Sequence, residues 1–107
     1  MLLSVNRNTF TREVLNSDRP VFVNFWTVGC AQCRKMRSTM KALDSSCNKE
    51  YRIVEVDLDN DRELADEYRV LGVPTLLIFK NGELVGRYSG MLQGNEVLAA
   101  SGTLVSG

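Results

Sequence analysis

Two cysteines separated by two residues, Cys30 and Cys33, follow an apolar run and precede a helix-like pattern. The run 20–25 is short, aromatic and β-branched, with proline at its first position, which predicts a buried strand. After Cys33, apolar residues recur at the spacing of one face of an amphipathic helix. These residues are Met36, Met40 and Leu43. The pair is therefore expected where a strand ends and a helix begins.

This position matters for the chemistry of the two thiols. The first N–H groups of a helix lack intrahelical partners, and the aligned peptide dipoles place partial positive charge there. A thiolate is favoured at that point, and the thiolate is the nucleophile in disulfide exchange. We expect Cys30 to be exposed and reactive, and Cys33, one turn further along, to be shielded. The alternative is that both are reduced, buried cysteines that act as small hydrophobic residues, but the strand-to-helix setting favours redox chemistry.

The length of 107 residues predicts a single domain, 1–107, which can bury a core without disulfide bonds. Thirteen basic and thirteen acidic residues give zero formal net charge, which argues against nucleic acid and anionic membranes as partners. The N-terminal residues lack the pattern of a secretory leader, and no apolar run reaches membrane-spanning length. We therefore expect a cytoplasmic, monomeric protein, in which a Cys-x-x-Cys pair is more often catalytic or metal-binding than structural.

The chain contains no histidine, so imidazole catalysis is excluded. A metal site could use only the three cysteines and the carboxylates. A metal or iron–sulfur carrier built from Cys30 and Cys33 would need two chains to supply four thiolates. We expect no metal and no cofactor other than a Cys30–Cys33 disulfide.

The remaining patterns alternate between strands and helices. The expected strands are 2–5, 20–25, 51–58, 75–80 and 83–89. Helices are expected after Asn8 as N-cap, after Cys30, after a capping box of Asn60 and Glu63, and over a last segment that includes Val97, Leu98, Ser101, Leu104 and Val105. Asn81–Gly82 predicts a type I′ hairpin turn.

This order predicts an α/β fold with a central mixed sheet of about five strands, flanked on both faces by about four helices. Helical crossovers between the early strands require parallel pairing, and the hairpin adds an antiparallel pair. The strand 51–58 is apolar on both faces and should lie inside the sheet.

At this point the chain resembles the thioredoxin family along nearly its whole length. The resemblance rests on Phe25–Trp26, on Cys30 and Cys33 with the basic Arg34, on Gly72-Val73-Pro74-Thr75, on Phe79-Lys80-Asn81-Gly82 and on Gly90. It implies the thioredoxin fold and a protein-disulfide reductase, reduced in turn by a thioredoxin reductase. It also implies that Cys30 attacks disulfide-containing protein substrates and that Cys33 resolves the mixed disulfide.

The resemblance further implies a substrate surface around the cysteines. In the family, the proline that matches Pro74 is cis, and the residue before it, here Val73, offers its backbone to an extended substrate. The expected substrate-binding residues are Trp26, Gly29, Ala31, Gln32, Val73, Pro74 and Gly90. Trp26 could equally pack beneath the site without touching substrate.

The chain departs from the family pattern at four positions. The tryptophan before the first cysteine is Gly29, and the usual Gly-Pro between the cysteines is Ala31-Gln32, which predicts a more oxidising disulfide. The usual buried aspartate is Asn24, and the lysine beside it is Glu55. A half-buried Glu55 could replace the aspartate as the general base for Cys33, with Asn24 holding a water. The alternative is that Glu55 reaches solvent or a basic neighbour.

Other charged and thiol groups have simpler interpretations. Cys47 is expected to be a spare thiol at a helix end. The basic group Arg34, Lys35, Arg37 and Lys41 is expected to be a solvated helix face that could help to select acidic protein surfaces. A non-catalytic docking module, or an oxidase- or isomerase-like variant, is the alternative function. Retention of both cysteines and Pro74 favours the reductase.

Overall fold

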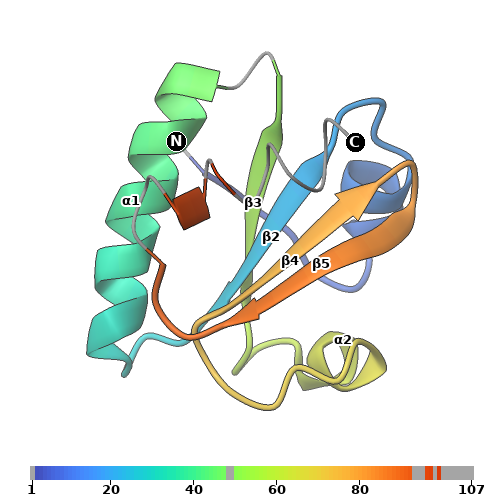
Figure 1. Ribbon diagram of the computed structural model, residues 1–107. Coiled ribbons are helices and arrows are strands. Elements are labelled where there is room, and N and C mark those ends of the chain that lie inside the picture. The colour runs from blue at the N-terminus through green and yellow to red at the C-terminus, as the bar shows by residue number, and fades with distance from the viewer. Residues whose placement is uncertain (1, 48–49, 93–95, 98, 100–107) are drawn as a thin grey trace.

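The computed structural model describes residues 2–47, 50–92, 96–97 and 99, and its elements are arranged as in Figure 1. In chain order they are β1 (Leu3–Ser4), η1 (Thr11–Leu15), β2 (Val21–Trp26), α1 (Ala31–Cys47), β3 (Arg52–Asp57), α2 (Arg62–Glu67), β4 (Thr75–Lys80) and β5 (Glu83–Ser89). The five expected strands are all present, and η1 is a π-helical turn.

The strands form one mixed sheet in the order β1-β3-β2-β4-β5. β3 pairs in parallel with both β1 and β2, which confirms its expected place inside the sheet. β4 runs antiparallel to β2, although a helical segment connects β3 to β4. The crossover argument therefore holds for the first three strands only, because the connection through α2 returns the chain in the opposite direction.

Helices cover both faces of the sheet, and each face has its own core (Figure 1). The α1 core contains Phe22, Met36, Met40, Ile53, Leu76 and Ile78, together with Leu2 and Val97. The opposite core packs η1 and α2 against Val21, Val23, Phe25, Val54, Val56, Leu77 and Phe79. Alternate residues of β2 thus point to opposite cores, as the two-residue period of a strand requires. Each such large apolar side chain contributes about 1.5–3 kcal/mol on burial.

Both predicted helix caps are wrong. Asn6, not Asn8, accepts the local N–H groups, because its Oδ1 binds the backbone amides of Asn8 and Thr9. Phe10 then precedes η1 without a side-chain cap. α2 also lacks a side-chain cap, because the Asn60 amide donates to Asp57 and the Glu63 carboxylate pairs with Arg7.

The hairpin between β4 and β5 confirms the predicted turn. Asn81 has φ 53° and Gly82 has φ 81°, so both central positions lie in the left-handed region that a type I′ turn needs. The expected last helix falls largely outside the described residues, including Leu98, Ser101, Leu104 and Val105. In the described part of the chain, no helix has the length and apolar character to span a bilayer.

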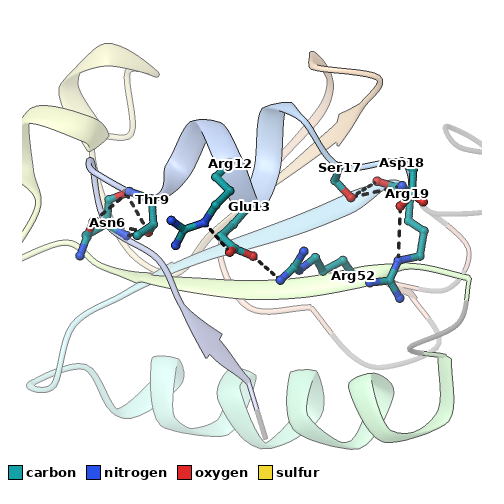
Figure 2. A network of polar contacts seen from close by, with 8 residues as sticks. All are labelled: Asn6, Thr9, Arg12, Glu13, Ser17, Asp18, Arg19 and Arg52. Atoms are coloured by element: carbon teal, nitrogen blue, oxygen red, sulfur yellow. Dashed lines mark hydrogen bonds and ion pairs between the residues drawn. The ribbon is translucent and has the colours of Figure 1, made fainter.

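A network of charges ties η1 to the sheet at the end far from the cysteines. Figure 2 shows Glu13 between Arg12, beside it on η1, and Arg52 at the start of β3. The Glu13 side chain is 18% exposed. The pKa of Glu13 is lowered from its ordinary value, chiefly by the hydrogen bond from Arg12 and also by the charge of Arg52.

This lowered pKa predicts how the stability depends on pH. The contribution of Glu13 is present above the pKa of an unfolded glutamate, about 4.3, and is lost as the pH falls through the lower folded value. Glu13→Gln should therefore lower the urea midpoint at pH 7, and the difference from the parent should shrink below pH about 4. The exposed Glu83, changed to Gln, is the matched control. A Glu13→Gln difference that stays constant down to low pH would contradict the ion-pair explanation.

Candidate active site

The two cysteines lie where the sequence placed them, between β2 and α1. The loop 27–30 leaves the end of β2 and turns once, with the Cys30 N–H donating to the carbonyl of Thr27 at 3.3 Å. α1 then begins at Ala31, and the Arg34 N–H donates to the Cys30 carbonyl at 3.2 Å. Cys30 therefore occupies the N-cap position of the helix.

The sulfur of Cys30 caps the helix in the way that serine or aspartate oxygen does elsewhere. The backbone N–H of Cys33 donates to Cys30 Sγ at 3.1 Å, so one of the orphan N–H groups of the first turn is directed at the sulfur. The sulfur also lies at the positive end of the helix dipole. Cys30 is half-buried, whereas Cys33 is fully buried, and both are free thiols. The predicted difference in exposure is confirmed.

The thiol of Cys33 is held in its protonated form. Burial, and after it the hydrogen bond with Cys30, raise the pKa of Cys33 to about 11, against a smaller opposing effect of the Thr27 backbone amide. At neutral pH only about one part in ten thousand of such a thiol is thiolate. Cys33 must therefore lose a proton before it can attack a disulfide.

Two strands contribute polar side chains to the sheet face that α1 covers. Asn24 is fully buried on β2 and pairs in register with Glu55 on β3. The side-chain amide of Asn24 and the indole N–H of Trp26 have no hydrogen-bond partner among the described residues. Burying such groups without a partner costs free energy. Unpaired buried groups in a native structure often have a functional explanation.

Glu55 is bound to a basic neighbour, which is the second of its two interpretations. Arg37 Nε donates to Glu55 Oε2 at 2.7 Å, and Arg37 Nη2 donates to Oε1 at 2.9 Å. The Glu55 side chain is only 5% exposed. The pKa of Arg37 is raised, chiefly by this hydrogen bond. Both carboxylate oxygens thus accept hydrogen bonds from one guanidinium, and the relay through Asn24 and Glu55 stays a hypothesis.

Arg37 also packs on the aromatic residue at the end of β2. Its guanidinium carbon lies 3.9 Å from the centroid of the Trp26 ring, a cation–π contact. Arg37 is therefore not part of a solvated helix face, and that part of the sequence interpretation is wrong. The sequence offered no signal for this contact, because Trp26, Arg37 and Glu55 come from three separate elements.

The strand register brings the proline loop to the same edge of the sheet. Phe25 pairs with Thr75, and Thr75 pairs with Ser89, so Pro74 and Gly90 both lie beside the end of β2. The Val73–Pro74 peptide bond is cis, as the resemblance implies. The Gly90 N–H donates to the Pro74 carbonyl at 2.9 Å, and the φ of 90° at Gly90 requires a glycine.

Several of the expected substrate-binding residues present an open surface around this edge. Gly29, Ala31 and Gln32 are exposed next to Cys30, Val73 and Gly90 are half-buried, and Trp26 is partly covered by Arg37. Val28 and Leu71 are exposed apolar residues that the sequence did not single out. Among the described residues, no group of acidic or cysteine side chains is arranged to hold a metal ion.

Comparisons with known proteins agree with this geometry. A family model described as Thioredoxin matches residues 1–101. The chain is 30% identical over 98 residues to the thioredoxin of Rickettsia bellii (strain RML369-C), which covers 92% of this chain and 93% of that protein. It is 36% identical over 81 residues to thioredoxin 1 of Nostoc sp. (strain PCC 7120 / SAG 25.82 / UTEX 2576), or 76% of each chain. A bifunctional thioredoxin reductase/thioredoxin of Mycobacterium leprae (strain TN) is 30% identical over 88 residues, which are 82% of this chain and 19% of that protein.

The ion pair between Arg37 and Glu55 predicts that removing one partner lowers the stability strongly and that removing the second partner restores most of it. Arg37→Met keeps an apolar stem over Trp26 but leaves the buried Glu55 carboxylate unpaired, which should cost about 3–5 kcal/mol of unfolding free energy. Adding Glu55→Gln to Arg37→Met should recover most of this loss, because no buried charge then remains. Urea unfolding measures both. Lys41→Met, an exposed position on the same helix, is the control and should change stability by less than about 0.5 kcal/mol. Equal effects of Arg37→Met and Lys41→Met would contradict the role of the pair.

Proposed function

Because the chain belongs to the thioredoxin family, we propose that Cys30 and Cys33 are the dithiol that performs its reaction. The chain is a dithiol–disulfide oxidoreductase that reduces protein disulfides. One observation carries the assignment of roles: the half-exposed Cys30 sulfur accepts the Cys33 N–H at the start of α1, while the Cys33 thiol is buried. Cys30 is the nucleophile, and Cys33 is the resolving thiol.

The reaction proceeds in two thiol–disulfide exchanges. The Cys30 thiolate attacks one sulfur of the substrate disulfide, forms a mixed disulfide and releases the other substrate sulfur as a thiolate. Cys33 then loses its proton and attacks Cys30 Sγ, which releases the second substrate sulfur. The substrate gains two electrons, and Cys30 and Cys33 are left joined in a disulfide. No metal or other cofactor is needed, because the two thiols of Cys30 and Cys33 supply the two electrons themselves.

The substrate lies as an extended segment along the surface around Cys30. Val73 offers it backbone hydrogen bonds beside the cis Pro74, and Gly90 leaves room at the other side of the loop. Gly29, Ala31, Gln32 and Trp26 form the remaining contact surface. The exposure of the first three supports this assignment, as does the register that aligns Pro74 with the end of β2.

The cellular setting is part of the proposal. A thioredoxin reductase returns the disulfide to the dithiol, and the fusion of the two activities in the Mycobacterium leprae relative supports such a partner. The protein acts as a monomer in the cytoplasm, within electron transfer to protein disulfides and redox homeostasis. The balanced net charge supports proteins rather than nucleic acid or membranes as partners.

The assignment of roles predicts which thiol reacts first. Alkylation at mildly acidic pH, followed by peptide mapping, should label Cys30 well before Cys33, because Cys33 is buried and its pKa is raised, whereas Cys30 is accessible. Cys30→Ser should abolish insulin reduction, whereas Cys33→Ser should accumulate a mixed disulfide with the substrate. Preferential labelling of Cys33, or turnover by Cys30→Ser, would contradict the roles.

The raised pKa of Cys33 predicts the pH dependence of the second exchange. Because Asn24 cannot accept a proton and Glu55 is engaged by Arg37, the rate should follow the thiolate fraction of Cys33. It should rise about tenfold per pH unit through the neutral range, toward the pKa of about 11. Asn24→Asp should introduce a base and raise the rate at neutral pH.

Stopped-flow measurement of resolution alone tests this expectation. A rate that is flat with pH and falls about tenfold to a hundredfold in Glu55→Gln would instead support the relay through Asn24 and Glu55. The first exchange, measured in Cys33→Ser, is the control, since it does not involve deprotonation of Cys33.

A further inference from the structure

A groove beside the proline loop carries positive charge only. This groove has a volume of about 510 Å³, and its lining includes Val73, Pro74 and Gly90, with Arg69 and Arg87 and no acidic residue. Both arginines are exposed, and neither has a carboxylate partner among the described residues. Two unpaired positive charges therefore face the surface along which an extended substrate is proposed to lie.

Arg69 occupies a backbone position at which glycine is preferred. Its φ is 55°, and it follows the last residues of α2 in the manner of a Schellman motif. The Val70 N–H donates to the Ala65 carbonyl at 2.8 Å, and the Arg69 N–H donates to the Asp66 carbonyl at 3.1 Å. The left-handed conformation is costly for a residue with a Cβ. A side chain that is kept there against this cost, at the mouth of a groove, points to a function for its charge.

Arg87 is anchored so that its position is well defined. It projects from β5 and donates to the backbone carbonyls of Tyr68, the C-cap of α2, and of Arg69, the residue after it. A guanidinium has five N–H donors, and these two bonds leave the others available. Arg87 thus holds the chain at Arg69 and adds a second fixed charge to the groove.

At the same edge of the sheet, the surface on the other side of β2 is mainly acidic. The hollow at the ends of β1 and β3 is lined by Asp57, Asp59, Asp61 and Glu63, against Arg7 and Arg62. Because β2 lies between β3 and β4, the end of β2 that leads to Cys30 separates an acidic side from a basic one. The charge of the surface therefore changes from negative to positive along the direction in which a substrate segment is proposed to cross it.

We propose that the groove formed by Arg69 and Arg87 selects protein substrates that carry aspartate or glutamate close to the reactive cysteine, on the part of the segment that crosses β4 and β5. This selectivity rests on the proposed function, because it acts on the mixed-disulfide step at Cys30. Carboxylates on the substrate pair with the two guanidinium groups and speed the encounter.

Short peptide disulfides test the selectivity. A series carries glutamate, glutamine or lysine at positions flanking a single cysteine on either side, and Trp26 fluorescence in a stopped-flow instrument reports the rate of the first exchange. On one side of the cysteine, glutamate should make the peptide react with the parent about two- to fivefold faster than glutamine does at low salt. On the other side, glutamate should give no such advantage. The preference should fall as ionic strength rises, because the charges are exposed.

Variants separate the effect of the arginine charges on the preference from their effect on the stability of the fold. Arg69→Lys should keep most of the preference, and Arg69→Gln combined with Arg87→Gln should abolish it. Arg62→Gln removes the same charge outside the groove and should keep it. Arg69→Gly should weaken the preference while the thermal midpoint stays the same or rises, because glycine adopts this conformation readily. If Arg69 had only a structural role, Arg69→Gly would instead lower the thermal midpoint.

The outcomes separate a failure of the proposed selectivity from a failure of the proposed disulfide-reductase function. Reduction of the uncharged 2-hydroxyethyl disulfide by the parent and by Arg62→Gln tests the reaction itself, and its failure would overturn the proposed function. If that reaction proceeds but glutamate and glutamine peptides react equally, or the preference survives the double arginine variant, the inference is wrong.

Discussion

The attachment of α1 to the sheet directly after β2 is the constraint on which the active site depends. Met36 and Met40 are fully buried against β2, β3 and β4, so the helix cannot shift without opening a core. Its first turn is thereby fixed beside the edge of the sheet, and the N–H of Cys33 points at the sulfur of Cys30. The difference between the two thiols is a direct result, because the same packing that exposes the helix start buries its next turn.

On the sheet face that α1 covers, the charges of Arg37 and Glu55 neutralise each other. Arg37 binds both oxygens of Glu55 and lies over Trp26, so three elements meet in one buried ion pair. Such a pair is costly to desolvate and is strongly destabilising only when it is broken. Its effect is to fix the end of β2 against α1. Asn24, which lies beside Glu55 in the register, carries an amide that cannot accept the proton of Cys33 as a carboxylate would.

Strand register explains how distant parts of the chain share one surface. The pairing of Phe25 with Thr75 and of Thr75 with Ser89 places the proline loop and Gly90 next to the start of α1. The end of α2 arrives at the same edge, where Arg69 and Arg87 contribute charge. The residues proposed for recognition and for chemistry therefore share one edge of the sheet, although they are separated by many positions in the sequence.

The sequence by itself determined the elements whose signals are local. The aromatic and β-branched composition of the run 20–25, the spacing of Met36 and Met40, and the positive-φ preference of Asn81–Gly82 each depend on neighbouring residues, and all three predictions hold. The family resemblance added the cis bond before Pro74. Helix caps were predicted wrongly because several asparagines and aspartates compete for the same N–H groups, and Asn6 and Asp57 prevailed over Asn8 and Asn60.

Only the tertiary structure decided which charges are buried and which are free. Arg34, Lys35 and Arg37 look alike in sequence, yet Arg37 alone faces the sheet and meets Glu55, because one face of α1 must pack on β2 and β3. The left-handed conformation of Arg69 and its meeting with Arg87 likewise depend on where α2 ends against β5. Contacts of this kind join residues far apart in the chain, and no local pattern records them.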